Sequence, residues 1–296
     1  MRCFKTILFA LLLCPIAIAA QGWNDNTYKQ IEQRVKQPEF PNRSFIITKY
    51  GAESKLSAAK NQLAINKAIL SCSKAGGGKV IIPSGIWNTG AITLKSNVNL
   101  VVEKGAHIIF AFDTSLYPIV KTRWEGMDCM NYQPCIYAYG EKNIAITGEG
   151  TIDGNGSVNT WWKMCGKDWF KAKEKITENQ NVGRPKLFEF VENGTPIEKR
   201  NMKGLGMRPQ LINLYKCEGI LIENVTLLNS PFWVMHPLLS KNITVRGVKV
   251  WNNGPNGDGC DPESCEDVII EGCNFHTGDD CIAIKSGRNA DGRKWN

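Results

Sequence analysis

The chain repeats a short pattern with a period of 23 to 25 residues. Residues 233–243 align with residues 258–268 without a gap at an offset of 25, and Glu218 precedes Lys241 by 23. Each unit begins with a polar pair and continues with a brief alternating run such as Ile243-Thr244-Val245. Repeats of this length with short β-branched runs and Gly or Asn turns are typical of solenoids.

No repeat contains a run long enough for a helical hairpin, and β-branched residues dominate. We therefore predict an all-β fold, a parallel β-helix in which each repeat forms one rung. A leucine-rich repeat is the structural alternative, but its fixed Leu/Asn frame is absent. Residues 58–75 are the exception, because apolar side chains recur there at helical spacing before Gly76. That segment predicts an N-terminal helix that caps the open end of the solenoid.

Three carboxylates occur one repeat apart: Asp258, then Asp279 and Asp280, 21 and 22 residues later. Because rungs stack at roughly 4.8 Å, residues one period apart should lie above one another on the same side of the coil. An Asp beside Gly is often only a turn residue. Three carboxylates brought together repel one another unless chemistry uses them, so we predict a catalytic cluster.

The N-terminus predicts export. Residues 1–20 contain Arg2 and Lys5, an apolar run and a small-x-small site, which is the pattern of a signal peptide. We expect a secreted or periplasmic protein with no membrane segment after cleavage. Residues 21–44 read as a polar lead-in, and residues 45–296 as the β-helix domain.

Residues 155–209 interrupt the repeat. This polar excursion carries Trp161, Trp162 and Trp169, and long excursions from a solenoid are often functional. The tryptophans either stack against sugar rings or pin the loop to the coil. The segment from Arg123 to Gly126 presents the same two alternatives.

Composition limits the partners. The formal charge is +8, or +6 without Arg2 and Lys5, which suits an anionic polymer. The sequence contains no basic run interleaved with aromatic residues, so we do not expect it to bind nucleic acid.

Nine cysteines remain after the signal peptide, and an odd number leaves at least one free if others pair. Four of them lie in the acidic rungs, at the spacing of stacked positions rather than of zinc ligands, so we predict no metal site there: Cys260, Cys265, Cys273 and Cys281.

Two short motifs carry a family resemblance. Asn256-Gly257-Asp258-Gly259 and Gly278-Asp279-Asp280-Cys281 resemble the acidic motifs of glycoside hydrolase family 28, the polygalacturonases. The similarity extends over nearly the whole mature chain, from Tyr50-Gly51-Ala52 through residues 150–154 to Ser286-Gly287-Arg288. It implies a right-handed parallel β-helix, expected to be a monomer, that hydrolyses α-1,4 bonds of pectin or polygalacturonate with inversion. Residues 282–289 are similar to members that include exo-acting enzymes.

The resemblance also implies roles. Asp279 matches the general acid, while Asp258 and Asp280 would hold and deprotonate the attacking water. Inversion needs the two carboxyl groups roughly 6.5–9.5 Å apart, with water between them. The expected substrate-binding residues lie on the same rungs: His236, Asp261, Lys285 and Arg288.

Two departures accompany the resemblance. The family places a Gly-His-Gly motif and an Arg-x-Lys motif beyond the Asp pair, and Asn296 comes before either; Gly278 also stands where the family often has Gln. We therefore expect poor solubility or low activity for residues 21–296.

Two other functions stay open: a polysaccharide lyase that uses calcium and a basic residue, and a non-catalytic carbohydrate-binding solenoid. The sequence does not decide between endo and exo action, or among polygalacturonan, xylogalacturonan and rhamnogalacturonan.

Overall fold

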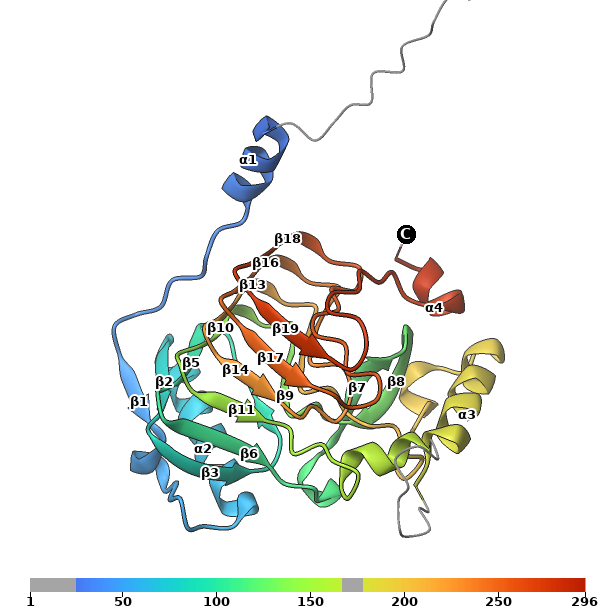
Figure 1. Cartoon of the computed structure of the whole chain (residues 1–296), viewed down its shortest axis with the longest axis horizontal. Helices are drawn as coiled ribbons and strands as arrows, with labels where there is room; N and C mark the ends of the chain where they lie inside the picture. Colours follow the sequence, from blue (N-terminus) through green and yellow to red (C-terminus); the bar gives the residue numbers. More distant parts are fainter. Residues whose placement is uncertain (1–24, 167–177, 296) are drawn as a thin grey trace, which may run out of the picture.

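The computed structural model describes residues 25–166 and 178–295 (Figure 1). The predicted signal peptide, residues 1–20, and Trp169 lie outside the described residues. The described strands form three stacks of parallel strands, here called sheets A, B and C, and one antiparallel hairpin. Sheet A comprises β1 (Ser44–Ile46), β2 (Gly78–Ile82), β5 (Val98–Val102), β10 (Lys142–Thr147), β13 (Glu218–Glu223), β16 (Lys241–Arg246) and β18 (Glu266–Glu271).

Sheets B and C complete each turn of the coil. Sheet B comprises β3 (Gly85–Thr89), β6 (Ala106–Phe110), β11 (Thr151–Asp153), β14 (Thr226–Leu228), β17 (Lys249–Asn252) and β19 (Asn274–Thr277). Sheet C comprises β4 (Ile92–Thr93), β9 (Ile136–Tyr139), β12 (Ile212–Tyr215) and β15 (Met235–Leu238). Single bridges extend sheet C through residues 260–263 and 282–285. The chain visits A, B and C in turn, which confirms the predicted parallel β-helix.

The observed register is the one that the repeat predicts. Lys241 pairs with both Glu218 and Glu266, and Ile243 pairs with Val268, so the offsets of 23 and 25 are true rung spacings. Parallel pairing at these offsets places side chains of equivalent positions in vertical ladders.

The polar pair that opens each unit is a turn into sheet A. Its second residue has a positive φ in every unit: 51° at Asn143, 71° at Gly219, 57° at Asn242 and 53° at Asp267. Gly, Asn and Asp are the residues that tolerate this left-handed conformation at low cost. The repeat seen in the sequence is therefore in part a repeat of backbone geometry.

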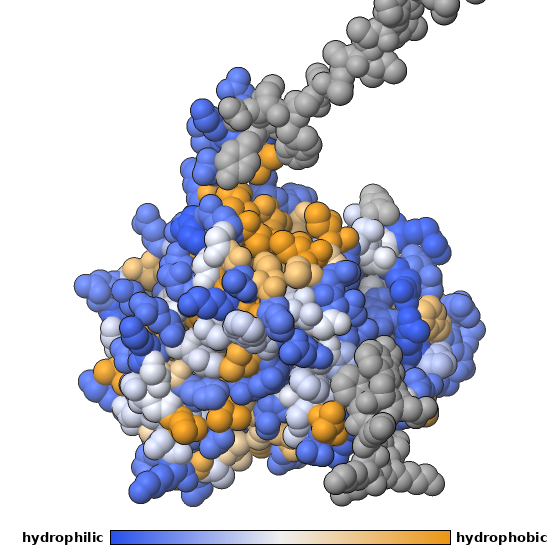
Figure 2. All heavy atoms as spheres, in the orientation of Figure 1, coloured by the Kyte–Doolittle hydropathy of each residue, from blue (hydrophilic) through white to orange (hydrophobic). Residues whose placement is uncertain are grey.

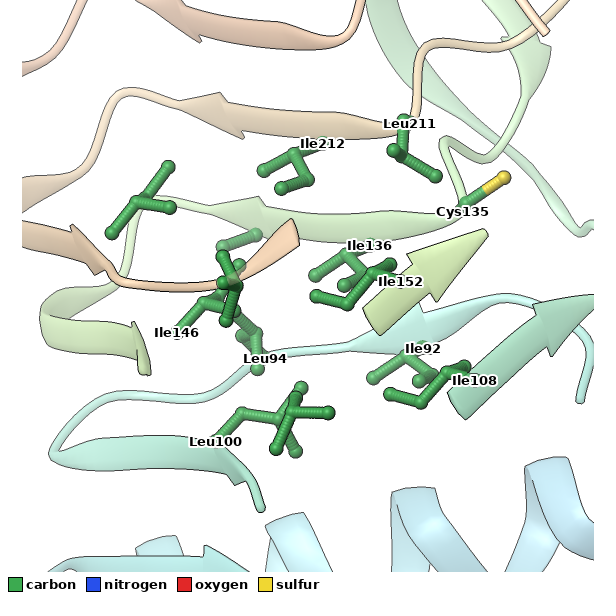
Figure 3. Packing of buried hydrophobic residues seen from close by; sticks show 14 of the residues in the cluster. Ile92, Leu94, Leu100, Ile108, Cys135, Ile136, Ile146, Ile152, Leu211 and Ile212 are labelled. Atoms are coloured by element: carbon green, nitrogen blue, oxygen red, sulfur yellow. The ribbon is translucent and has the colours of Figure 1, made fainter. Parts of the chain in front are cut away.

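Apolar ladders from the three sheets fill the coil (Figure 3). Side chains such as Ile146, Ile152 and Ile212 are at most 1% exposed, as close-packed interiors require. At the β18 end the ladders become exposed, and Ile284 reaches 89%. Figure 2 shows apolar surface gathered at this end of the coil.

Helices lie at both ends of the coil. Helix α2 (Ala58–Lys74) packs against β1, β2, β3, β4 and β5, and buries Ile65, Ala68, Ile69 and Cys72, which confirms the predicted cap. Helix α1 (Asp25–Arg34), which the sequence analysis did not predict within residues 21–44, lies near β18, where Arg34 pairs with Asp267 at 2.9 Å. Among the described helices, none is long and apolar enough to cross a bilayer.

The longest connections all leave sheet B and return to sheet C, so they gather at one corner of the coil. The connection after β6 forms the hairpin of β7 (Ile119–Trp124) and β8 (Met127–Tyr132). The connection after β11 is the predicted excursion, with helix α3 (Gln180–Glu192). Both pack together around one apolar cluster, which comprises Trp124, Met127, Cys129, Leu187, Val191, Met202, Met207, Phe232 and Trp233.

The tryptophans of these connections pin them in place. Trp124 is fully buried and stacks on Phe232 with ring centroids 4.9 Å apart. Trp161 is also fully buried, and it packs edge-on against Phe112 and Tyr117. Neither ring is available to stack against a sugar, so for these two residues the pinning alternative holds.

The left-handed turn gives a testable prediction. Gly219→Ala should lower the free energy of unfolding by about 1–2 kcal/mol, because an Ala side chain is strained at positive φ. Gly219→Asn adds a larger side chain but should cost less, since Asn occupies the equivalent position in two other units. Denaturant unfolding of both variants measures the difference; equal losses would contradict this account of the turn.

Candidate active site

The three predicted aspartates meet at the corner between sheets B and C. Asp258 follows β17, while Asp279 and Asp280 follow β19 one rung further on. The Gly259 N–H donates to the Asp280 carbonyl at 2.9 Å, and Cys260 pairs with Ile282. One carboxylate oxygen from each aspartate lies within 4.8 Å of the others. The expected vertical alignment of the three aspartates is therefore confirmed.

A pocket of about 440 Å³ opens beside this cluster. Five successive connections from sheet B to sheet C contribute to its lining, from the hairpin to the turn after β19. The side chains of the pocket are mostly charged: Glu125, Arg184, Asp258, Glu263, Asp279, Asp280, Lys285 and Arg288, with Trp233 and Asn256 between them.

The carboxyl groups of the site differ sharply in their surroundings. Asp258 is 4% exposed and Asp261 is 0% exposed, whereas Asp279 and Asp280 are exposed to solvent. Burial raises the pKa of Asp258, although Lys285 opposes this. Burial, together with the charge of Asp258, raises the pKa of Asp261 to about 9 despite Lys285. The surroundings therefore favour the protonated form of Asp261 more strongly than that of Asp258.

Lys285 connects the two buried carboxyl groups. Its ammonium lies 3.2 Å from Asp258 and 3.7 Å from Asp261, and sits 4.2 Å from the centroid of the Trp233 ring. Burial lowers the pKa of Lys285, but the charges of Asp261 and Asp258 outweigh it and leave that pKa raised. Lys285 is therefore a fixed positive charge on the floor of the pocket.

A buried charge network supports the pocket from below. Arg123 is 0% exposed and contacts Asp128 at 3.0 Å and Glu263 at 2.9 Å. Tyr215 donates to Asp128 at 3.0 Å, and Asp291 on α4 (Asn289–Arg293) accepts from the Asp128 N–H at 3.1 Å. The network joins the hairpin, the coil and α4, and so holds the corner together.

Glu263 and His236 form one hydrogen-bonded pair within this network. Asn213 donates to Nδ1 of His236 at 3.1 Å, so the ring proton is on Nε2 and is donated to Glu263 at 2.9 Å. Burial alone would raise the pKa of Glu263, but the hydrogen bond from His236 and the charge of Arg123 outweigh it and lower that pKa. Glu263 is thus an anion that contributes to the pocket lining.

Two of the four expected substrate-binding residues are enclosed by protein, and their role in binding stays a prediction. The side chains of His236 and Asp261 are both 0% exposed, so neither reaches a sugar directly in this structure. His236 contacts Glu263 at 2.9 Å, and Asp261 lies 3.7 Å from Lys285, so each touches a residue that lines the pocket. The other two, Lys285 and Arg288, do line the pocket.

Sequence reasoning did not assign Glu263, Glu125 or Arg184 to the site. Glu263 lies one rung before Lys285 in sheet C, a position that the register could have suggested. Arg184 comes from an excursion with no repeat, so no sequence period could have placed it. The nine cysteines described are all free, so none of the pairing that export would allow is present among them.

Comparisons with a family model and with known proteins identify relatives of this chain. The model for glycosyl hydrolases family 28 matches residues 190–293. A hyperthermoactive exopolygalacturonase of Thermotoga maritima has 41% sequence identity and a TM-score of 0.85 over 90% of this chain. The chain belongs to glycosyl hydrolases family 28.

Two further relatives are less similar in sequence than the Thermotoga maritima protein. A "Probable polygalacturonase" of Vitis vinifera is 32% identical over 77% of the chain, and an exo-poly-alpha-D-galacturonosidase of Dickeya chrysanthemi is 26% identical over 84%. The chain spans 41% and 43% of the length of these two relatives, and 60% of the Thermotoga maritima chain.

The buried network predicts a large effect of Arg123. Arg123→Met should lower the free energy of unfolding by about 3–5 kcal/mol, because Asp128 and Glu263 would lose a buried counter-charge. Arg246→Met, which removes a half-exposed arginine paired with Glu223 and Glu271, should cost at most about 1 kcal/mol. Denaturant unfolding compares the two; similar losses would mean that the buried network adds little.

Asp261 predicts a pH-dependent stability. Its folded pKa of about 9 lies far above the ordinary value near 3.9, so folding favours the protonated form. The stability contributed is complete below about pH 4 and falls as the pH rises toward 9. The Asn side chain of Asp261→Asn cannot ionise. The melting temperature of this variant minus that of the parent protein should therefore increase as the pH rises from about 4 to about 9. A difference that stays constant with pH would contradict the raised pKa.

Proposed function

We propose that this family 28 chain hydrolyses α-1,4-galacturonosidic bonds of pectin or polygalacturonate. The observation that carries the proposal is the convergence of Asp258, Asp279 and Asp280 beside a pocket that also holds Lys285 and Arg288. Acid and base catalysis of glycoside cleavage needs carboxyl groups on either side of the bond. Cations beside them suit a sugar that carries its own carboxylate.

The roles follow the motif match. Asp279 protonates the leaving glycosidic oxygen, and Asp258 with Asp280 holds and deprotonates the attacking water. The exposed position of Asp279 suits a group that meets the substrate, while Lys285 holds Asp258 in place at 3.2 Å. The cleavage consumes one water and needs no cofactor.

The proposed stereochemical course is inversion, as the family resemblance implies. The nearest oxygens of the three carboxylates lie within 4.8 Å, closer than the roughly 6.5–9.5 Å between carboxyl groups that typifies inverting enzymes. Nearest oxygens always lie closer than the carboxyl groups as a whole. The anomeric form of the first product, observed by NMR during turnover, decides between inversion and retention.

A lyase is the second candidate, because the same three carboxylates lie close enough to hold a cation. A lyase also needs a base to remove the sugar C5 proton. Lys285 is poorly suited to that task because Asp261 and Asp258 raise its pKa and keep it protonated. Loss of activity on chelation, with an unsaturated product that absorbs in the ultraviolet, would favour the lyase.

Further parts of the proposal concern the setting of the enzyme. We propose export to a secreted or periplasmic location, consistent with a polymeric pectin substrate outside the cell. We also propose a monomer. Size-exclusion chromatography with light scattering tests the oligomeric state.

Asp279→Asn provides the main test. On oligogalacturonides its rate of reducing-end release should fall roughly 10²- to 10⁴-fold, because the proposed general acid is lost. Asp267→Asn is the matched control, since this aspartate lies in a left-handed turn outside the pocket and Asn fits there. If the parent protein hydrolyses and Asp279→Asn is equally active, the proposed role is wrong; if hydrolysis is absent throughout, a binding solenoid is favoured.

A further inference from the structure

Two arginines converge on one glutamate at the wall of the pocket. Nε of Arg184 lies 2.7 Å from Oε2 of Glu125, and Nη1 of Arg288 lies 3.3 Å from the same oxygen. The three residues come from α3, the segment before α4, and the hairpin turn, and all three line the pocket of the aspartate cluster. The excursion thus delivers a cation to a site built mainly by the coil.

An aromatic ring orients both guanidinium groups. The central carbons of Arg184 and Arg288 lie 5.6 and 5.5 Å from the centroid of the Phe188 ring. Phe188 follows Arg184 by one helical turn on α3, so their side chains lie on the same face. Cation–π contacts at this distance hold a guanidinium without using its N–H donors.

The backbone around Arg288 is held closely against the hairpin. Its N–H donates to the Gly126 carbonyl at 2.9 Å. Gly126 has a φ of +83°, and a Cβ there would lie 2.7 Å from the Arg288 nitrogen. Only a glycine allows this approach, so Glu125 and Arg288 are placed together before any ligand arrives.

The charges of this group do not balance. One carboxylate faces two guanidinium groups, and among the described residues neither arginine has a second acidic partner. The side chains of Arg184 and Arg288 are 45% and 40% exposed and both line the pocket, so a ligand there can reach their guanidinium groups. Guanidinium groups in this setting favour a carboxylate, which they bind through paired hydrogen bonds.

We propose that Arg184 and Arg288, held by Glu125 and Phe188, bind the carboxylate of a uronate residue of the substrate. This inference rests on the proposed function, because it assumes that an acidic saccharide enters the pocket. It assigns to α3 a part in recognition: the helix selects a sugar acid over a neutral or methyl-esterified sugar.

The experiment compares trigalacturonate with its methyl ester by calorimetric titration. It uses the full chain carrying Asp279→Asn to prevent turnover. Adding Arg184→Gln should weaken binding of the acid form roughly 10- to 100-fold, the effect of losing hydrogen bonds to a charged group, and leave the ester unchanged. Arg184→Lys keeps the positive charge but loses the paired N–H donors of the guanidinium group, so it should weaken binding of the acid form less than Arg184→Gln does.

Lys186→Gln is the matched control. Lys186 is a cation on the same helix that pairs with Glu189 at 3.0 Å and does not line the pocket. It should change the affinity for neither ligand. Equal affinity of the Arg184→Gln and parent proteins for the acid form, or equal weakening for acid and ester, would overturn the proposed subsite.

The two proposals fail separately. If the parent protein hydrolyses oligogalacturonides and Arg184→Gln binds them normally, the subsite is wrong and the hydrolase stands. If binding depends on Arg184 and on the carboxylate but no hydrolysis occurs, the hydrolase is wrong and the subsite stands. If the parent neither binds nor hydrolyses, both are wrong.

Discussion

Hydrogen bonding between successive parallel turns of the coil is the constraint on which the rest of the structure depends. The pairs Glu218–Lys241 and Lys241–Glu266 fix each turn above the previous one with no freedom to slip. A slip of one residue would move every apolar side chain out of the core. The same pairing sets Asp258 beside Asp280, so the site inherits its geometry from the core. The same register between successive strands therefore both buries the apolar core and brings the aspartates together.

The coil concentrates its irregular parts at one corner. A regular rung has no room for a hairpin or a helix, so the added chain length leaves the coil between sheets B and C. There it forms a second apolar cluster, with Trp124 and Phe232 stacked, and a wall beside the aspartates. Arg123 links this wall to the coil through Asp128 and Glu263, with no exposure to water. A buried ion network of this kind serves position more than stability, because desolvation offsets much of the attraction.

The site is an arrangement of near-compensating charges. Lys285 stands between Asp258 and Asp261 and limits the repulsion of the acidic cluster. Arg184 and Arg288 share Glu125 and leave positive charge facing the pocket. Acidic and basic groups thus occupy different parts of one cavity. In the proposed reaction the acidic part performs the chemistry, and the basic part holds the substrate.

The sequence by itself determined the coil, because its period, its left-handed turn residues and the spacing from Asp258 to Asp280 are local properties of the chain. It also determined helix α2, whose apolar spacing needs no partner to be recognised. Only the tertiary structure decided which side chains reach the pocket. The period could place His236 and Asp261 near the aspartates, but it could not show that packing encloses both completely. Nor could it bring Arg184 to Arg288, since 104 residues separate them and contact between an excursion and the coil depends on how both fold.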